Sequence, residues 1–422
     1  MSRNADTPRS ARTRKLRSWL LVVSLLWMAI NNGVMLWHTR EQMRKGYGDF
    51  ASFYTAGTLL RRGLGAELYN PAAQWKVQQE FASDVNIRNG PLCYLRPPFE
   101  AVFFSGLAAW PYPTALVVLT GIKLALFAAI PFIVVRARPW KESFPLWMAV
   151  ILILGTFPAF MDLLMGQDAV FLAILFAICF WQLDTGRDMG AGVTLGLALF
   201  KFQLVLPFVA ILWIAGRRRV LPGFAISGSA VLVISAALVG WRGLFKYPGY
   251  LLAMNRTTGV GIASQVQMTL RGLLTFFAGD MFYSPHILWL LVPVAIGAVV
   301  YTGLIWRRAG EGFLAEGFGL AAMVAIVTSY YASDYDLLLL IVPLLAMRTR
   351  PHPADVPRAD SLTRYLEVGG LLLLLLTPLY WFTRMQLHAE CLMTIPLLAV
   401  SVALARRLHD AGAGKLCAQD AE

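Results

Sequence analysis

Charged residues are scarce in this sequence. Asp, Glu, Lys and Arg make up 14% of its 422 residues, whereas a soluble domain carries about 25%. Hydrophobic residues make up 58%, and the mean hydropathy is +0.60. This composition excludes an ordinary soluble protein. Because apolar runs of about 20 residues cross a membrane as helices, it predicts an all-α polytopic membrane protein.

Cysteines are few, and the common cofactor motifs are missing. The four cysteines are scattered and show neither a disulfide framework nor the spacing of metal ligands. The sequence has no Walker loop, dinucleotide-binding fingerprint, zinc motif or nucleophile elbow. We therefore expect no metal and no cofactor. The predicted cytoplasmic loops are too short for a nucleotide-sugar domain, so a transferase with this layout must take its donor from the membrane.

The basic excess is distributed as in a membrane protein. The net charge is +13, but Lys and Arg form short clusters between apolar segments, as in cytoplasmic loops beside anionic lipid. This pattern argues against nucleic acid as a partner. Residues 1–17 are expected to form a basic cytoplasmic tail, and residues 18–37 are long enough to span the membrane. No small-residue cleavage site precedes His38, so we interpret this segment as a retained anchor.

The predicted organisation is a single transmembrane domain over residues 18–405, followed by a cytoplasmic tail at 406–422. The longest polar region, 38–96, is the first outer loop. It is expected to hold two amphipathic helices that lie on the membrane. Apolar residues recur at helical spacing over about 50–62. Asn70-Pro71 has the pattern of a helix start, an N-cap followed by proline.

The topology depends on the apolar segment 97–110. It is too short to cross and is expected to be a half-helix or a re-entrant segment. If it returns to the side it came from, basic clusters such as Arg217–Arg219 and Arg307-Arg308 all face the cytoplasm, as the positive-inside rule favours. This arrangement gives about twelve transmembrane helices with both termini inside. It places carboxylates, amides and isolated arginines on the outer side, where we expect a chemical site.

Asp49, in Gly46-Tyr47-Gly48-Asp49-Phe50, is the first carboxylate after the polar residues that end the first span. It is therefore expected near the membrane surface, where it is a candidate catalytic base. The competing interpretation is structural, because an Asp after a Gly is more often a turn residue or a helix N-cap.

Polar groups at membrane depth are functional candidates, because a charge there costs several kcal/mol. Lys201 is expected near the outer end of a helical hairpin, where it either pairs with a lipid phosphate or extends to the headgroups. Gln167 and Asp168 occupy another outer turn and either bind a sugar hydroxyl or cap the next helix. Arg96 precedes two prolines and either clamps a phosphate or anchors the half-helix.

Two further groups are expected on the outer side. Arg256 and Arg271 are isolated cations in the long loop 241–285, and each is either a phosphate ligand or an ordinary surface arginine. Asp334 and Asp336 lie at an outer helix end. They either form a second acidic wall of a cavity, or Asp336 lies at a helix start only because the helix dipole favours a carboxylate there.

A series of short motifs follows one order along the chain. They are Asp49 after the first span, Tyr54-Thr55-Ala56-Gly57, Gly65-Ala66-Glu67-Leu68-Tyr69, Arg96-Pro97-Pro98-Phe99, Gly166-Gln167, Ala191-Gly192 and Lys201. Together they resemble glycosyltransferase family 87, the polyprenol-phosphate-mannose-dependent α-mannosyltransferases with the GT-C membrane fold. The resemblance runs diffusely over about residues 18–350.

Three positions depart from the family pattern. The usual Tyr-Pro-Pro is Arg96-Pro97-Pro98, the usual Lys-Pro is Lys201-Phe202, and the frequent Gly-Gln-Asn is Gly166-Gln167-Asp168. Such changes are compatible with a different sugar or acceptor, so mannose is not carried over as the specific sugar.

The resemblance implies an inverting transfer of a sugar, either mannose or another hexose or pentose, from a polyprenyl-phosphate donor to a lipid- or glycan-linked hydroxyl. The expected location is the outer side of a bacterial inner membrane. Asp49 would act as general base. Cationic partners would stabilise the phosphate leaving group, in the order Lys201, Arg96 and Arg256. The residues expected to contact substrate are Tyr54, Gln167, Asp168, Gln203, Asp334 and Asp336.

Two rival functions remain open at this point. A transporter or lipid-linked glycan flippase also suits broken helices and intramembrane charges, although the sequence shows no internal inverted repeat. A polymerase or ligase that acts on undecaprenyl-linked glycans is the other alternative.

Overall fold

The computed structural model describes residues 8–85, 90–136, 145–256, 266–278, 285–349, 360–375 and 377–419, and all regular secondary structure within them is helical. The α-helices are α1 Pro8–Arg44, α2 Phe50–Arg61, α3 Pro71–Phe81, α4 Glu100–Leu107, α5 Tyr112–Arg136, α6 Leu146–Gly155, α7 Phe157–Met165, α8 Ala169–Asp184, α9 Asp188–Leu197, α10 Phe202–Ile214, α11 Val220–Arg256, α12 Leu270–Ala278, α13 Pro285–Ala309, α14 Leu314–Thr328, α15 Ile341–Thr349, α16 Ser361–Leu375, α17 Thr377–Met385 and α18 Thr394–Gln419. The short 3-10 helices are η1 Gly65–Glu67, η2 Ala198–Lys201, η5 Glu311–Phe313, η6 Asp334–Leu340 and η7 Glu390–Met393.

Six helical stretches in the described part of the chain are long and apolar enough to cross a membrane. The number becomes seven if α6 and α7, which meet at 66°, count as one bent span. The protein is therefore an all-α polytopic membrane protein, as its composition predicts. The expected count of about twelve transmembrane helices is not confirmed.

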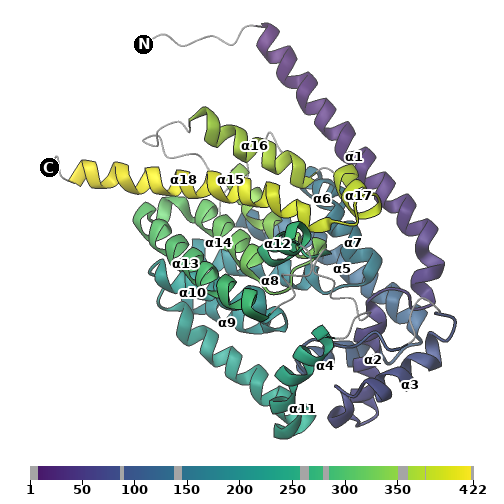
Figure 1. Cartoon of the computed structure of the whole chain (residues 1–422). Coiled ribbons are helices and arrows are strands. Elements are labelled where there is room, and N and C mark those ends of the chain that lie inside the picture. Colours follow the sequence, from purple (N-terminus) through teal and green to yellow (C-terminus); the bar gives the residue numbers. More distant parts are fainter. Residues whose placement is uncertain are drawn as a thin grey trace.

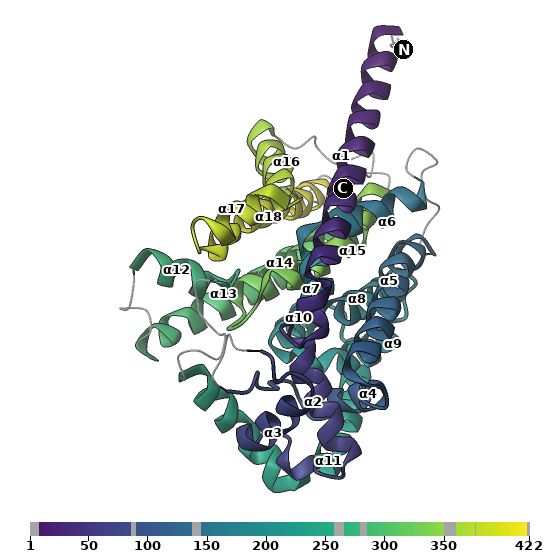
Figure 2. The same ribbon diagram turned by 90° about the vertical axis from the view of Figure 1, so that its right-hand side faces the viewer.

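The first helix is longer than the predicted anchor. Segment 18–37 lies inside α1, a single helix of 37 residues that begins at Pro8. Part of the predicted N-terminal tail is therefore helical. At 1.5 Å per residue, α1 is about 55 Å long. Figures 1 and 2 show it as a rod along the outside of the molecule, with an N-terminal end that projects beyond the other helices.

The predicted first outer loop contains two α-helices, α2 and α3. They lie with the second half of α11, after the break at Gly240, at one end of the molecule (Figures 1 and 2). Asn70 caps α3, because its side-chain oxygen accepts the backbone N–H of Ala72 at 3.0 Å. The helix start predicted at Asn70-Pro71 is thus confirmed. α2 differs from a helix that lies freely on the lipid, because Phe50 and Phe53 bury it in an aromatic core.

Segment 97–110 contains only the eight-residue helix α4. Its length of about 12 Å is well short of the membrane core of about 30 Å, in agreement with the predicted half-helix. α4 packs closely on α2 at Gly57. A Cβ atom at Gly57 would lie 2.3 Å from the carbonyl oxygen of Phe104, so only glycine allows this approach.

The stretch Asp188–Ile214 has the length and composition of a single span, but it reverses direction. A straight helix of this length would separate its ends by about 40 Å. Arg217, just after α10, instead forms an ion pair with Asp188 at the start of α9, at 3.3 Å. The reversal falls at η2, where Lys201 leaves the helical backbone region (φ −117°, ψ 55°). α9 and α10 are therefore the two arms of a hairpin with Lys201 at its tip, as predicted.

Arg217 also connects two of the predicted cytoplasmic loops. Its guanidinium lies 3.4 Å from Glu311, which follows the basic cluster Arg307-Arg308 at the end of α13. α18 also contacts this cluster, because a Cβ added at Gly412 would lie 3.0 Å from the Cβ of Arg308. The clusters at 217–219 and 307–308 thus occupy the same end of the bundle, away from the hairpin tip.

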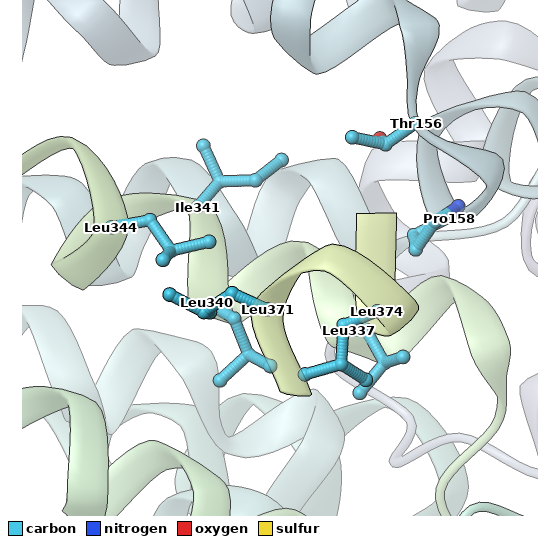
Figure 3. A pocket seen from close by; sticks show the side chains of 8 residues that line it. All are labelled: Thr156, Pro158, Leu337, Leu340, Ile341, Leu344, Leu371 and Leu374. Atoms are coloured by element: carbon cyan, nitrogen blue, oxygen red, sulfur yellow. The ribbon is translucent and has the colours of Figure 1, made fainter. Parts of the chain in front are cut away.

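A small apolar cavity lies among α7, η6, α15 and α16 (Figure 3). Its volume is about 20 Å³, close to the space that one water molecule needs. Seven of its eight lining residues are Leu, Ile or Pro, and the eighth is Thr156. The Thr156 hydroxyl donates to the carbonyl of Ile153 at 2.7 Å. The size and lining of this cavity do not suit a sugar or a phosphate.

Candidate functional site

A much larger cavity, of about 690 Å³, opens beside the hairpin tip. Its walls come from the start of α2, the irregular segment 91–96, the turn before α8, the start of α10, the second half of α11 and the segment before η6. The lining residues are Asp49, Ser52, Phe53, Leu92, Cys93, Leu95, Arg96, Gln167, Phe200, Phe202, Gln203, Tyr247, Pro248, Leu251, Leu252, Tyr330, Tyr331 and Tyr335. Among these lining residues, Asp49 is the only carboxylate and Arg96 the only cation.

Asp49 is the residue before the first turn of α2, but its side chain does not cap that helix. The carboxylate oxygen Oδ2 instead accepts a hydrogen bond from the Gln167 side-chain amide at 2.6 Å. The backbone carbonyl of Asp49 accepts the Ser52 hydroxyl at 2.8 Å. The N-cap interpretation is therefore not supported, and the carboxylate is held toward the cavity.

Two glycines allow the turn that carries Gln167 to press against the start of α2. Gly166 has a left-handed backbone (φ 66°), and an added Cβ would lie 2.6 Å from the Cβ of Phe50. A Cβ at Gly48 would lie 3.0 Å from the carbonyl oxygen of Met165. The close contact of these two backbones places the Gln167 amide within reach of Asp49.

Arg96 joins this pair to a second carboxylate. Its Nε donates to Asp168 Oδ2 at 2.6 Å, and its terminal nitrogen donates to Asp168 Oδ1 at 3.1 Å. The same terminal nitrogen lies 3.4 Å from Gln167 Oε1. This is the bidentate geometry that suits an arginine and a carboxylate. Asp168 precedes α8 without capping it through its side chain, so the capping interpretation of Asp168 is not supported.

Lys201 lies on the other side of Asp168 and is fully buried. Its ammonium lies 2.7 Å from Asp168 Oδ1 and 2.5 Å from Asp336 Oδ1. Asp336 also accepts the backbone N–H of Ser333 at 2.9 Å, which completes a capping box at the start of η6. Two carboxylates thus balance the Lys201 charge, and Lys201 is not among the cavity-lining residues. This setting differs from the open phosphate contact expected from the sequence.

The segment that carries Arg96 has no regular secondary structure, and side chains satisfy its backbone. Gln78 of α3 accepts the Leu92 N–H at 2.9 Å, and Gln74 accepts the Tyr94 N–H at 2.9 Å. The hydroxyl of Tyr247, in the second half of α11, donates to the carbonyl of Leu95 at 2.9 Å. These bonds fix an irregular backbone where it lines a cavity, the setting in which membrane proteins tolerate such backbone.

Burial and nearby charges shift the pKa values of two carboxyl groups on this wall, Asp168 and Glu100. Burial opposes ionisation of Asp168, but Arg96 and Lys201 hold the pKa of Asp168 well below its usual range. Burial and the adjacent Asp168 carboxylate raise the pKa of Glu100 well above its usual range. Of these two carboxyl groups, Asp168 is the one whose ionised form its neighbours stabilise.

The other predicted site residues are placed differently. Gln203 lines the cavity. Tyr54 does not: its hydroxyl donates to the carbonyl of Trp110 at 2.9 Å, and its ring packs among other aromatic rings. Asp334 is buried and lies 3.1 Å from Arg384, which also contacts Glu390 at 3.1 Å. The side chain of Arg256 lies outside the described residues, so its role stays a prediction.

A buried pair that sequence reasoning missed supports the Gln167 turn. Lys123 of α5 donates to the backbone carbonyl of Gln167 at 2.8 Å and forms an ion pair with Asp162 at 2.9 Å. Asp162 Oδ1 accepts the backbone N–H of Ala169 at 3.0 Å. The signal was a lysine inside an apolar span, which marks a functional or structural charge by default.

In the described ranges, no group of three or more His, Cys, Asp or Glu side chains has the arrangement of a metal site. The geometry instead offers one carboxylate with a fixed orientation, an adjacent arginine and a largely apolar enclosure.

A comparison with protein families matches residues 94–348 to the model described as glycosyltransferase family 87. The match covers more than half of the chain and includes Arg96, Gln167, Lys201 and Asp336. Asp49 lies before the matched region. A search of curated proteins finds no match.

Proposed function

Because the chain belongs to glycosyltransferase family 87 and is a membrane glycosyltransferase, we propose that it transfers a sugar from a polyprenyl-phosphate donor to an acceptor hydroxyl, with Asp49 as general base. The observation that carries this proposal is the position of Asp49. Its carboxylate stands on the wall of a cavity of about 690 Å³, where Gln167 orients it.

The proposed step is a single displacement with inversion. Asp49 accepts the proton of the acceptor hydroxyl as its oxygen attacks the anomeric carbon. The bond between this carbon and the phosphate oxygen breaks, and its electron pair leaves with the phosphate. The hydrogen bond from Gln167 fixes the carboxylate in one orientation before the acceptor arrives, so little reorganisation is needed in the transition state.

We assign different tasks to the two central cations. Arg96 lines the cavity and lies beside Gln167, so it is the cation of this wall that is positioned to meet a bound phosphate. Lys201 holds Asp168 and Asp336 together and, through Asp168, fixes the orientation of Arg96. Arg256 remains a further candidate for the phosphate.

The donor's isoprenoid chain fits the apolar part of the cavity. Phe200 and Phe202 lie at the hairpin tip, and Leu251 and Leu252 belong to the second half of α11. A lipid-linked donor would bring its apolar tail along these side chains and its phosphate toward Arg96. The sugar is proposed to be mannose or another hexose or pentose, and the acceptor a lipid- or glycan-linked hydroxyl.

We place the reaction on the outer side of a bacterial inner membrane. The support is the separation of the charges. The basic clusters at 217–219 and 307–308 share one end of the bundle through Arg217, Asp188 and Glu311. The hairpin tip with Lys201 and the cavity lie away from that end. Basic loops favour the cytoplasm, so the cavity is assigned to the opposite face.

The test uses the purified protein in proteoliposomes, incubated with radiolabelled polyprenyl-phosphate sugars and a membrane extract as the source of acceptor. We expect a labelled product from the wild type and at least a hundredfold loss for Asp49→Asn, because general-base catalysis contributes about 10²–10⁴-fold. Asp84→Asn is the matched control, since Asp84 is an exposed carboxylate of the same loop. Labelled lipid that crosses the membrane without product formation would favour a transporter or flippase. Normal turnover of Asp49→Asn would exclude Asp49 as the base.

A further inference from the structure

Both cations described on the polar wall of the cavity are already paired with carboxylates. Arg96 is paired with Asp168, and Lys201 is paired with Asp168 and Asp336. Asp168 and Asp336 thus engage both of the cations described on this wall. A phosphate that enters the cavity adds further negative charge. At Arg96 this phosphate would compete with Asp168, so a cation from another wall would stabilise the donor complex.

Arg271 of α12 is such a cation. Its side chain is only 9% exposed, and its Nη1 is buried without a hydrogen-bond partner. Among the described residues, the guanidinium forms no ion pair with a carboxylate. It lies 4.1 Å from the ring centre of Tyr330, which lines the cavity. The stacking on Tyr330 fixes the plane of the guanidinium next to the cavity wall.

Gln267 lies four residues before Arg271 and is fully buried. Neither its side-chain oxygen nor its side-chain nitrogen has a hydrogen-bond partner. This stretch is held in place by its backbone, because the Met268 N–H donates to the carbonyl of Ala332 at 2.9 Å. Ala332 directly follows the cavity-lining Tyr331. Gln267 and Arg271 are thus fixed against the segment that forms one side of the cavity.

Three unpaired polar atoms in one short stretch are unusual. Buried polar groups are nearly always hydrogen-bonded, and each one left unpaired costs about 1–3 kcal/mol. The atoms offer guanidinium and amide N–H donors together with one amide oxygen. Two donor groups in one short stretch, one of them charged, suit the oxygens of a phosphate. The amide oxygen suits a neighbouring hydroxyl group, such as that of a sugar.

We infer that Gln267 and Arg271, on the side of the cavity formed by Tyr330, complete with Arg96 the phosphate-binding subsite of the donor. This inference rests on the proposed function. Arg271 supplies the charge that the Arg96–Lys201 wall lacks, and the Gln267 amide donates to a second oxygen of the same phosphate. Asp49 lines the same cavity, so the base and the leaving group would share one enclosure.

The test measures binding separately from transfer. Radiolabelled farnesyl phosphate is bound to the full-length protein in nanodiscs, with farnesol and inorganic phosphate as competitors. We expect Arg271→Met to raise the Kd for farnesyl phosphate about ten- to a hundredfold, the range for a lost charge-assisted hydrogen bond. Gln267→Met should raise it about three- to tenfold without loss of stability, because it removes two unpaired polar atoms from the interior. Farnesol binding should not change in either variant.

Arg187→Met is the matched control. Arg187 also lies over an aromatic ring, that of Trp181, but it follows the end of α8, whereas the cavity lies at the start of that helix. Arg271→Lys keeps the charge and should show an intermediate Kd, which guards against a fold defect in Arg271→Met. Wild-type affinity of a folded Arg271→Met protein would overturn the subsite. Equal competition by inorganic phosphate and farnesyl phosphate would indicate a site for free phosphate and overturn the donor assignment. Farnesyl phosphate binding that depends on Arg271, without any sugar transfer by the wild type, would refute the proposed function and leave the subsite standing.

Discussion

Replacement of Lys201 by methionine tests whether this lysine holds the carboxylates together. Asp168 would keep Arg96 as its partner, but Asp336 would keep only the backbone N–H of Ser333. Removal of one member of a buried ion pair costs about 3–5 kcal/mol, because the remaining charge stays buried. Asp336→Asn alone leaves Lys201 paired with Asp168 and should cost about 1–3 kcal/mol. The double variant Lys201→Met/Asp336→Asn removes both charges, and its loss should be about 2–3 kcal/mol smaller than the sum of the single losses.

The assay is SDS-induced unfolding in mixed micelles, which reports the free energy of unfolding of each variant. Losses that add within about 0.5 kcal/mol would refute the reasoning, since independent sites behave in that way. A second measurement separates this role from the phosphate contact expected from the sequence. If Lys201 touched the donor, Lys201→Met would raise the KM for the donor, and adding Asp336→Asn to that variant would not lower it again. If Lys201 acts through Asp168, the double variant should recover part of the donor affinity.

Three further predictions concern the supports of the site. Gly166→Ala should reduce transfer and lower the free energy of unfolding by about 1–3 kcal/mol, because the left-handed backbone and the contact with Phe50 leave no room for a Cβ. The control is Gly186→Ala, which is also at a left-handed turn but has no atom within 4 Å of the added Cβ. It should show only the cost of backbone strain and keep its activity. Lys123→Met should lower kcat more than it raises the KM for the donor, because Lys123 supports the Gln167 turn; an unchanged kcat in the folded variant would remove this role. Burial raises the pKa of Asp334 to about 6, although Arg384 opposes the shift. The folded chain therefore holds a proton that the unfolded chain has lost, so stability should decline as the pH rises from about 4 to about 6. Asp334→Asn should flatten this decline, and an unchanged pH profile would contradict the assignment.

The sequence predicted those features that depend on local signals. The N-cap at Asn70, the short helix in 97–110 and the reversal at Lys201 all follow from residues close to each other in the chain. Composition alone was enough for the helical membrane class. The association of Asp49, Arg96, Gln167 and Asp168 was anticipated only as a shared side of the membrane, which charge distribution can indicate.

The partners within the site could not be predicted, because they come from distant parts of the chain. Lys201 and Asp336 are separated by 135 positions, and nothing local to either residue indicates the other. The sequence also offered Tyr54 as a substrate contact, but the ring faces an aromatic core that only tertiary packing creates. Lys123 was overlooked, because its apolar neighbours identify α5 as a span and give no sign of the Gln167 backbone.

The chain order of the buried network has a consequence for biogenesis. Arg96, Asp168 and Lys201 are synthesised well before Asp336, 135 positions after Lys201. At about 5–20 residues per second, the ribosome needs roughly 7–27 s to reach Asp336. During this interval Lys201 has only one of its two carboxylate partners, Asp168, which it shares with Arg96. The buried network at the hairpin tip is therefore completed only after η6 has emerged. In a nascent chain that stops before Asp336, Lys201 lacks this second partner.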